Sequence, residues 1–151
     1  MKTAFIIGYV WPEPASSAAG SRMLQLIRSL QDAGYRLVYG SAAQTSPHAL
    51  DLNGIDVQAL TLTLKCSSFD QLVAEMQPEL VIFDRFMMEE QFGWRVEKHC
   101  PQAIRVLDTE DLHCLRHARH QALKHNTELT AKQIYSELAI REIAAILRCD
   151  L

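Results

Sequence analysis

The chain has 151 residues, of which 48% are hydrophobic and 22% are charged, values that are ordinary for one globular domain. Its net charge is only −3 and its basic residues form no long run, so we expect no nucleic-acid partner and no binding to an anionic membrane surface. No apolar run approaches the roughly 20 residues that a membrane-spanning helix needs, and we therefore expect no transmembrane segment.

Residues 4–10 are apolar on both faces, which is typical of a central buried strand. The run is short and ends at Pro12-Glu13-Pro14, so we interpret it as a strand rather than as a signal peptide. A helix follows, which Ser16 or Ser17 can cap and whose apolar residues recur with the 3.6-residue period of a buried face. Gly34 is suited to end that helix.

The middle of the chain continues the alternation of strands and helices. Residues 36–42 are predicted to form a second strand, and turn residues are frequent over 43–55. Apolar and polar residues alternate over 57–64, which indicates a half-buried third strand. A short helix is predicted over 69–76. The apolar run 80–83 predicts a fully buried fourth strand.

The C-terminal part adds a helix over about 87–99, a fifth strand over 104–107, and two helices over about 111–125 and 130–147, with a break at Asn126-Thr127. Strands that alternate with helices predict a parallel sheet with right-handed crossovers. The expected fold is therefore α/β, a doubly wound Rossmann-like three-layer sandwich with a mainly parallel sheet.

The last residues follow the final helix directly. In an α/β chain, a pair such as Asp150-Leu151 after a helix usually begins a strand, and the alternative is that the helix frays into a tail. We favour the first interpretation, and with it a chain that is a truncated or incomplete product.

None of the four cysteines forms a C-x-x-C pair; they are Cys66, Cys100, Cys114 and Cys149. We expect free thiols in a reducing compartment, and hence a cytoplasmic protein.

Ligands of doubly wound sheets bind outside the carboxyl ends of the strands, so the loops after the first, fourth and fifth strands are the candidate sites. The first loop runs into a helix start of small residues, where backbone N–H groups and the helix dipole favour an anion. Small residues there could equally serve close packing alone. The predicted ligand-binding residues of this loop are Ser16, Ser17, Gly20 and Ser21.

The second loop begins with Asp84 and Arg85, a charged pair that is costly to bury without a use. Asp84 could accept a hydrogen bond from a substrate hydroxyl, and Arg85 could bind a carboxylate or a phosphate. The alternative is structural, with Asp84 capping the next helix and Arg85 pairing with it.

The third loop is the densest in polar residues. Glu110, Asp111 and His113 are the predicted catalytic residues, because carboxylates next to a histidine suit general-base chemistry. Asp108 and Arg116 flank them as predicted substrate-binding residues. The alternative is that Asp108 or Thr109 caps a helix and the next two carboxylates favour its first turn.

A metal site is a further alternative at the same place. His113, His117 and His120 share one helix face, with Cys114 beside them, and two histidines at i and i+4 can bind zinc. The H-E-x-x-H motif is absent and arginines interleave with the histidines. We therefore expect no metal, and a polar surface face instead.

The loops resemble those of a known family. The first strand, Pro12-Glu13-Pro14 and the small-residue helix start are similar to the N-terminal half of GT-B glycosyltransferases, nearest to glycosyltransferase family 4, also called group 1. The run from Val106 to Arg116 resembles a segment that bacterial members carry after their fifth strand. Residues 148–151 look like the start of their next strand, and the resemblance covers essentially the whole chain.

The resemblance implies an enzyme of glycan biosynthesis that transfers a sugar from a nucleotide-sugar donor to a sugar or glycan acceptor, with retention of configuration and without a metal or cofactor. In this family the N-terminal domain receives the acceptor, residues 16–21 approach the donor phosphates, and a polar residue after the fifth strand faces the reacting sugar. The second domain, which carries most nucleotide-sugar contacts, is not in this chain. We therefore expect the chain alone to be inactive.

Two other classes stay open. A stand-alone flavodoxin- or receiver-like binding module needs a self-sufficient ligand loop. A receiver has acidic residues where this chain has Tyr9-Val10-Trp11, and a flavodoxin phosphate loop is matched only in part by Ser16 to Ser21. A fragment with a structural role would form a homodimer through the face that a second domain would cover, which an exposed apolar patch around the last helix would favour.

Overall fold

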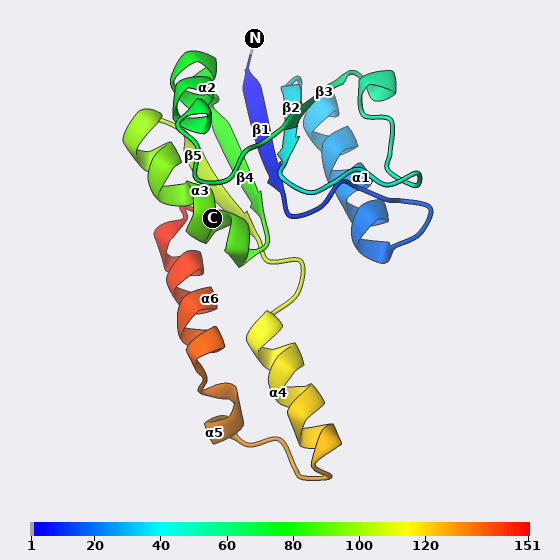
Figure 1. Cartoon of the computed structure of the whole chain (residues 1–151), viewed down its shortest axis with the longest axis vertical. Coiled ribbons are helices and arrows are strands. Elements are labelled where there is room, and N and C mark those ends of the chain that lie inside the picture. Colours follow the sequence, from blue (N-terminus) through cyan, green and yellow to red (C-terminus); the bar gives the residue numbers. More distant parts are fainter. Residues whose placement is uncertain (1) are drawn as a thin grey trace.

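A computed structural model describes residues 2–151 and shows a five-stranded sheet in which all neighbouring strands are parallel (Figure 1). The order of the strands is β3-β2-β1-β4-β5. After β1, the chain adds β2 and then β3 on one side of it, and then adds β4 and β5 on the other side. This reversal confirms the predicted doubly wound Rossmann-like fold. The strands are β1 (Thr3–Gly8), β2 (Arg36–Ser41), β3 (Val57–Thr61), β4 (Leu80–Asp84) and β5 (Ile104–Asp108).

β1 is the central strand, and all six of its residues are buried. Phe5 pairs with Val38 of β2 on one edge and with Val81 of β4 on the other. A strand with neighbours on both edges and helices over the sheet meets little water, which explains its continuous apolar run. The prediction that the strand continues to Val10 is wrong, because the chain bends away after Gly8 and leaves Tyr9 and Val10 each 42% exposed.

Helices cover both faces of the sheet. α1 (Ala18–Asp32) lies on one face, and α2 (Ser68–Met76) and α3 (Phe86–His99) lie on the other (Figure 1). Met23 and Ile27 of α1 share an apolar cluster with Ile6 of β1. On the other face the rings of Phe69 and Phe92 pack with their centroids 4.5 Å apart. A 3-10 turn, η1 (Asn53–Ile55), lies in the connection from β2 to β3.

The rest of the chain is a helical hairpin that extends beyond the carboxyl end of β5 (Figure 1). It consists of α4 (His113–Lys124), the short α5 (Ala131–Ile134) and α6 (Glu137–Arg148). The predicted break at Asn126-Thr127 is confirmed, but the prediction of one helix over 130–147 is wrong. Ser136 leaves the helical path and caps α6, where its Oγ accepts the N–H of Ala139 at 3.1 Å. Within residues 2–151, no helix is long and apolar enough to cross a membrane.

The start of α4 differs from the capping alternative considered for this loop. The helix begins at His113 and has no side-chain cap of its own, so the alternative in which Asp108 or Thr109 caps it is wrong. The cap comes from α6: the buried carboxylate of Glu142 accepts the N–H groups of His113 and Cys114 at 2.9 and 2.8 Å. This contact holds the two arms of the hairpin together.

The outer face of α6 is apolar. Ile140, Ile143 and Leu147 lie three and four residues apart and are exposed. Two charged side chains of α6 form ion pairs with α3: Arg141 binds Glu90, and Arg148 binds Glu89. The exposed apolar patch that a homodimer or a second domain would cover is therefore present, and what covers it stays a prediction.

The last two residues lie beside β5. The N–H of Asp150 donates to the carbonyl of Arg105 at 2.8 Å, and the N–H of Leu107 donates to the carbonyl of Leu151 at 2.8 Å. These bonds, with a longer one from the N–H of Leu151 to Arg105, follow the pattern of a parallel strand pair. The last two residues are therefore bound to β5, which argues against a frayed tail, but they are not part of a sixth strand, and the predicted strand start stays a prediction.

Candidate functional site

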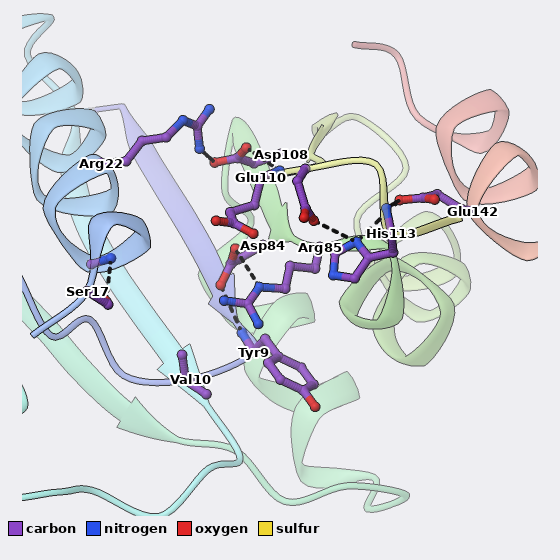
Figure 2. Close-up of polar contacts among 12 residues, drawn as sticks. Tyr9, Val10, Ser17, Arg22, Asp84, Arg85, Asp108, Glu110, His113 and Glu142 are labelled. Atoms are coloured by element: carbon purple, nitrogen blue, oxygen red, sulfur yellow. Dashed lines mark hydrogen bonds and ion pairs between the residues drawn. The ribbon is translucent and has the colours of Figure 1, made fainter. Parts of the chain in front are cut away.

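A cavity of about 300 Å³ lies at the carboxyl ends of β1 and β4, where the strand order reverses. The start of α1 forms one wall, and residues that follow β4 and β5 form the other (Figure 2). Such a reversal point is where doubly wound sheets bind ligands. The polar residues that line the cavity are Glu13, Ser17, Arg22, Asp84, Arg85 and Glu110.

The first wall is the N-terminus of α1. Ser17 caps the helix, and its Oγ accepts the N–H of Gly20 at 2.9 Å. The first N–H groups of an α-helix have no partner within the helix and carry a partial positive charge. Ala19 and Gly20 line the cavity, and no acidic residue stands in the first turn. This helix start is suited to an anion.

The other small residues of this loop support the backbone instead of lining the cavity. Ser16 Oγ donates to the carboxylate of Glu13 at 2.7 Å, and Ser21 Oγ donates to the carbonyl of Pro14 at 2.8 Å. A Cβ on Gly20 would lie 2.4 Å from the backbone of Glu13. Close packing, the alternative considered for this loop, therefore explains the glycine.

On the opposite wall, Asp84 is 6% exposed, and its carboxylate accepts the N–H of Tyr9 at 3.3 Å. The structural alternative is half correct: Asp84 does not cap α3, whose N-cap is Arg85, but Arg85 does pair with Asp84. Burial raises the pKa of the Asp84 carboxyl, although the neighbouring Arg85 guanidinium, 3.8 Å away, opposes the rise. A buried carboxyl beside a cation suits recognition of a ligand hydroxyl.

Replacing Asp84 with asparagine is expected to raise the free energy of unfolding near neutral pH, because asparagine keeps an acceptor for Tyr9 and removes the buried charge. Between the ordinary pKa of 3.8 and its raised value in the folded protein, the folded state binds more protons than the unfolded chain, so wild-type stability falls as the pH rises. Urea unfolding from roughly pH 3 to 7 measures this. The gap between variant and wild type should close toward low pH, and a gap that does not change with pH would contradict the expectation.

Arg85 has an unusual backbone. Its φ of 76° and ψ of 153° lie in a region that side chains rarely adopt. Its Cζ lies 4.9 Å from the centroid of the Tyr9 ring, and its Nε is buried with no hydrogen-bond partner in residues 2–151 (Figure 2). A strained residue costs about 1–3 kcal/mol and persists because its surroundings hold it. A guanidinium with such a buried Nε beside a cavity is chemically suited to a phosphate or a carboxylate.

The loop after β5 brings one further carboxylate to the cavity. Glu110 has a φ of 58°, and its N–H donates to Asp108 at 3.1 Å. Asp108 itself is not free for a ligand, because Arg22 of α1 binds its carboxylate. This ion pair joins the two walls of the cavity (Figure 2).

The remaining predicted residues of this loop lie elsewhere. The backbone turns at Glu110, and neither Asp111 nor His113 lines the first cavity. His113 points toward Glu142 of the hairpin instead (Figure 2). His113 Nδ1 is 3.3 Å from both Asp111 and Glu142, and Arg116 binds Asp111 at 2.9 Å. The three predicted catalytic residues are thus divided between two places.

The metal alternative has no support. In the part of the chain that the structure describes, no three histidine, cysteine or carboxylate side chains come together as ligands of one ion. The imidazole of His113 is held by two carboxylates instead.

Comparison with known proteins adds little to this geometry. No family model and no curated protein matches the sequence. Among solved structures, the chain is similar to one described as "Structure of glycinamide-RNase-transformylase T from Mycobacterium tuberculosis", with 16% identity and a TM-score of 0.42. The match covers 82% of this chain and 33% of that one, so this chain spans about a third of that protein's length. A likeness at this level says nothing about activity.

Sequence reasoning missed Tyr9, Glu13 and Arg22. Tyr9 and Glu13 lie in the stretch assigned to the strand and its proline-rich end. Arg22 is the fifth residue of α1, beyond its first turn, and its place in the sequence gave no indication of its partner. That partner, Asp108, is distant in sequence, and only the fold brings the two together.

Proposed function

We propose that the chain is the N-terminal, acceptor-side half of a GT-B glycosyltransferase and contributes part of the phosphate-binding loop for a nucleotide-sugar donor. The observation that carries this proposal is the cavity at the reversal point, which has the N-terminus of α1 on one wall and Arg85 on the other. Two groups that favour an anion thus face one space.

Carboxylates in the same cavity suit the sugar part of such a ligand. Asp84 and Glu110 line it together with Arg85, and carboxylates accept hydrogen bonds from hydroxyl groups. A phosphate bound by the helix and the arginine would leave these two acceptors for a sugar. A ligand that carries both phosphate and hydroxyl groups fits the cavity better than a simple anion.

The proposed reaction moves a sugar from the nucleotide-sugar donor to a sugar or glycan acceptor, without a metal or cofactor. This chain's own residues bind and orient: α1 and Arg85 hold phosphate oxygens, and Glu110 faces the sugar. The cavity is small for a complete nucleotide sugar, because small-molecule sites span about 300–1,000 Å³. We infer that a second domain supplies further contacts to the nucleotide sugar, and that this chain alone does not turn over.

The test is a titration of the isotope-labelled chain with UDP-glucose and GDP-mannose, followed by amide NMR and by calorimetry. We expect shifts at the N–H groups of Ala18, Ala19 and Gly20, and an affinity weaker than micromolar, because half of the contacts are missing. Uridine, which has no phosphate, should shift none of the three. Micromolar binding of a nucleotide sugar to this chain alone, or no response at these amides, would contradict the proposal.

The alternative function is that of a stand-alone flavodoxin-like module. Its phosphate would bind at the same wall of the cavity, the N-terminus of α1. The α1 N-terminus could receive the phosphate of a flavin mononucleotide. The same titration separates the two functions, since a self-sufficient module should bind flavin mononucleotide tightly, and half of a transferase should not.

A further inference from the structure

A second cavity lies at the base of the helical hairpin, between the first turn of α3 and the facing sides of α4 and α6. Its volume is about 540 Å³, which is within the usual range of small-molecule sites, about 300–1,000 Å³. It shares no lining residue with the cavity at the reversal point. A ligand in this hairpin cavity would therefore be bound by different residues from the ligand proposed above.

The polar side of the hairpin cavity is basic. α4 contributes Arg116 together with His113, His117 and His120, and α6 contributes Arg141. The histidines are spaced at i, i+4 and i+7, which places them on one face of the helix. An imidazole can donate a hydrogen bond even when it is neutral. No carboxylate lines the hairpin cavity.

Both arginines are held in place from outside the cavity and keep donors to spare. Glu90 of α3 accepts from Arg141 Nε and Nη2 at 2.9 and 2.7 Å. Asp111 binds one Nη of Arg116 at 2.9 Å. A guanidinium carries five N–H groups, so each arginine has donors beyond those that its carboxylate uses. Positioned guanidinium groups recognise phosphate and carboxylate.

The other side of the hairpin cavity is apolar. Phe86 and Met87 of α3 face Leu138 of α6 across it, and Arg141 lies over the Phe86 ring with 5.4 Å from Cζ to the centroid. Phe86 and Met87 also form the first turn of α3, which has no side-chain cap.

We propose that the hairpin cavity binds a small anion, a phosphate or a carboxylate, that is attached to an apolar or aromatic body. The anion contacts Arg116 and Arg141, and the body packs on Phe86 and Leu138. This assignment does not depend on sugar transfer, because it uses only residues outside the first cavity.

The test uses 1-naphthyl phosphate and 1-naphthoate as probes, and compares them with 1-naphthol, which has no anion, and with inorganic phosphate, which has no apolar body. Binding is followed through the imidazole NMR resonances. We expect both aromatic anions to shift the resonances of His117 and His120 and to leave that of His125 unchanged, because His125 ends the same helix outside the cavity. The relative affinity of the two probes shows which anion the site prefers.

A matched pair of variants completes the experiment. Arg116→Gln removes a lining cation and should weaken the preferred probe by about tenfold, the effect of losing one hydrogen bond to a charged group. Arg119→Gln, three residues further on α4 and outside this cavity, should change the affinity less than twofold, roughly the effect of a distant surface charge. Equal binding of 1-naphthol, equal losses in the two variants, or shifts confined to the residues around Arg85 would overturn the proposal.

Discussion

Replacing Arg148 with alanine is expected to lower the free energy of unfolding by about 1–3 kcal/mol, the cost of leaving a buried acceptor without its partner, because Glu89 is buried although the Arg148 side chain is 48% exposed. Arg148 Nε donates to both carboxylate oxygens of Glu89, at 2.9 and 3.2 Å, and an Nη donates as well. Glu89 is on α3 and only 3% exposed. Without the guanidinium, the folded protein would hold a buried carboxylate that has lost its cation.

Chemical unfolding followed by circular dichroism measures this loss. Arg141→Ala is the matched control, because Arg141 makes the same kind of bidentate pair, with Glu90, between the same two helices. The side chain of Glu90 is 24% exposed, against 3% for Glu89, so we expect a loss of about 1 kcal/mol or less for this control. Losses of similar size in the two variants would mean that burial of Glu89 is not what makes its pair important.

Most strands and helices could be predicted from the sequence because each depends on the pattern of its own residues. A continuous apolar run such as residues 4–7 needs a buried strand, whatever else the chain contains. The start of α4 was not predictable in this way, because its cap is Glu142, 28 residues or more away in sequence. The break before α6 depends on the single residue Ser136, whose cap competes with an otherwise continuous helical pattern.

The candidate site was predictable in position and less so in composition. The rule that ligands bind at the carboxyl ends of strands located Asp84, Arg85 and Glu110 correctly at one cavity. It could not separate Glu110 from Asp111, which are adjacent in sequence. The positive φ at Glu110 turns the chain there, and helix and strand periodicities carry no information about such a turn.

Arg85→Gly is expected to weaken ligand binding, and it also removes the cation 3.8 Å from the buried Asp84 carboxylate, so its stability is compared with a second variant that has the same loss. A guanidinium that contacts a phosphate makes hydrogen bonds worth about 1.5–3 kcal/mol. The dissociation constant for UDP-glucose should therefore rise at least about tenfold. Glycine also adopts a φ of 76° without strain. Relief of about 1–3 kcal/mol of strain should offset the entropy that glycine adds to the unfolded chain, about 0.4–1 kcal/mol.

Arg85→Ala is the control that separates the two effects, because alanine removes the guanidinium but keeps the Cβ that makes the backbone conformation unfavourable. Both variants lose the contact with the Tyr9 ring, so the difference between them reports the backbone alone. We expect the glycine variant to be more stable than the alanine variant by about 1 kcal/mol, with the same loss of binding. If the two variants are equally stable, the backbone at this position is not strained. If both bind UDP-glucose as the wild type does, the cation at the end of β4 is not held there for the phosphate.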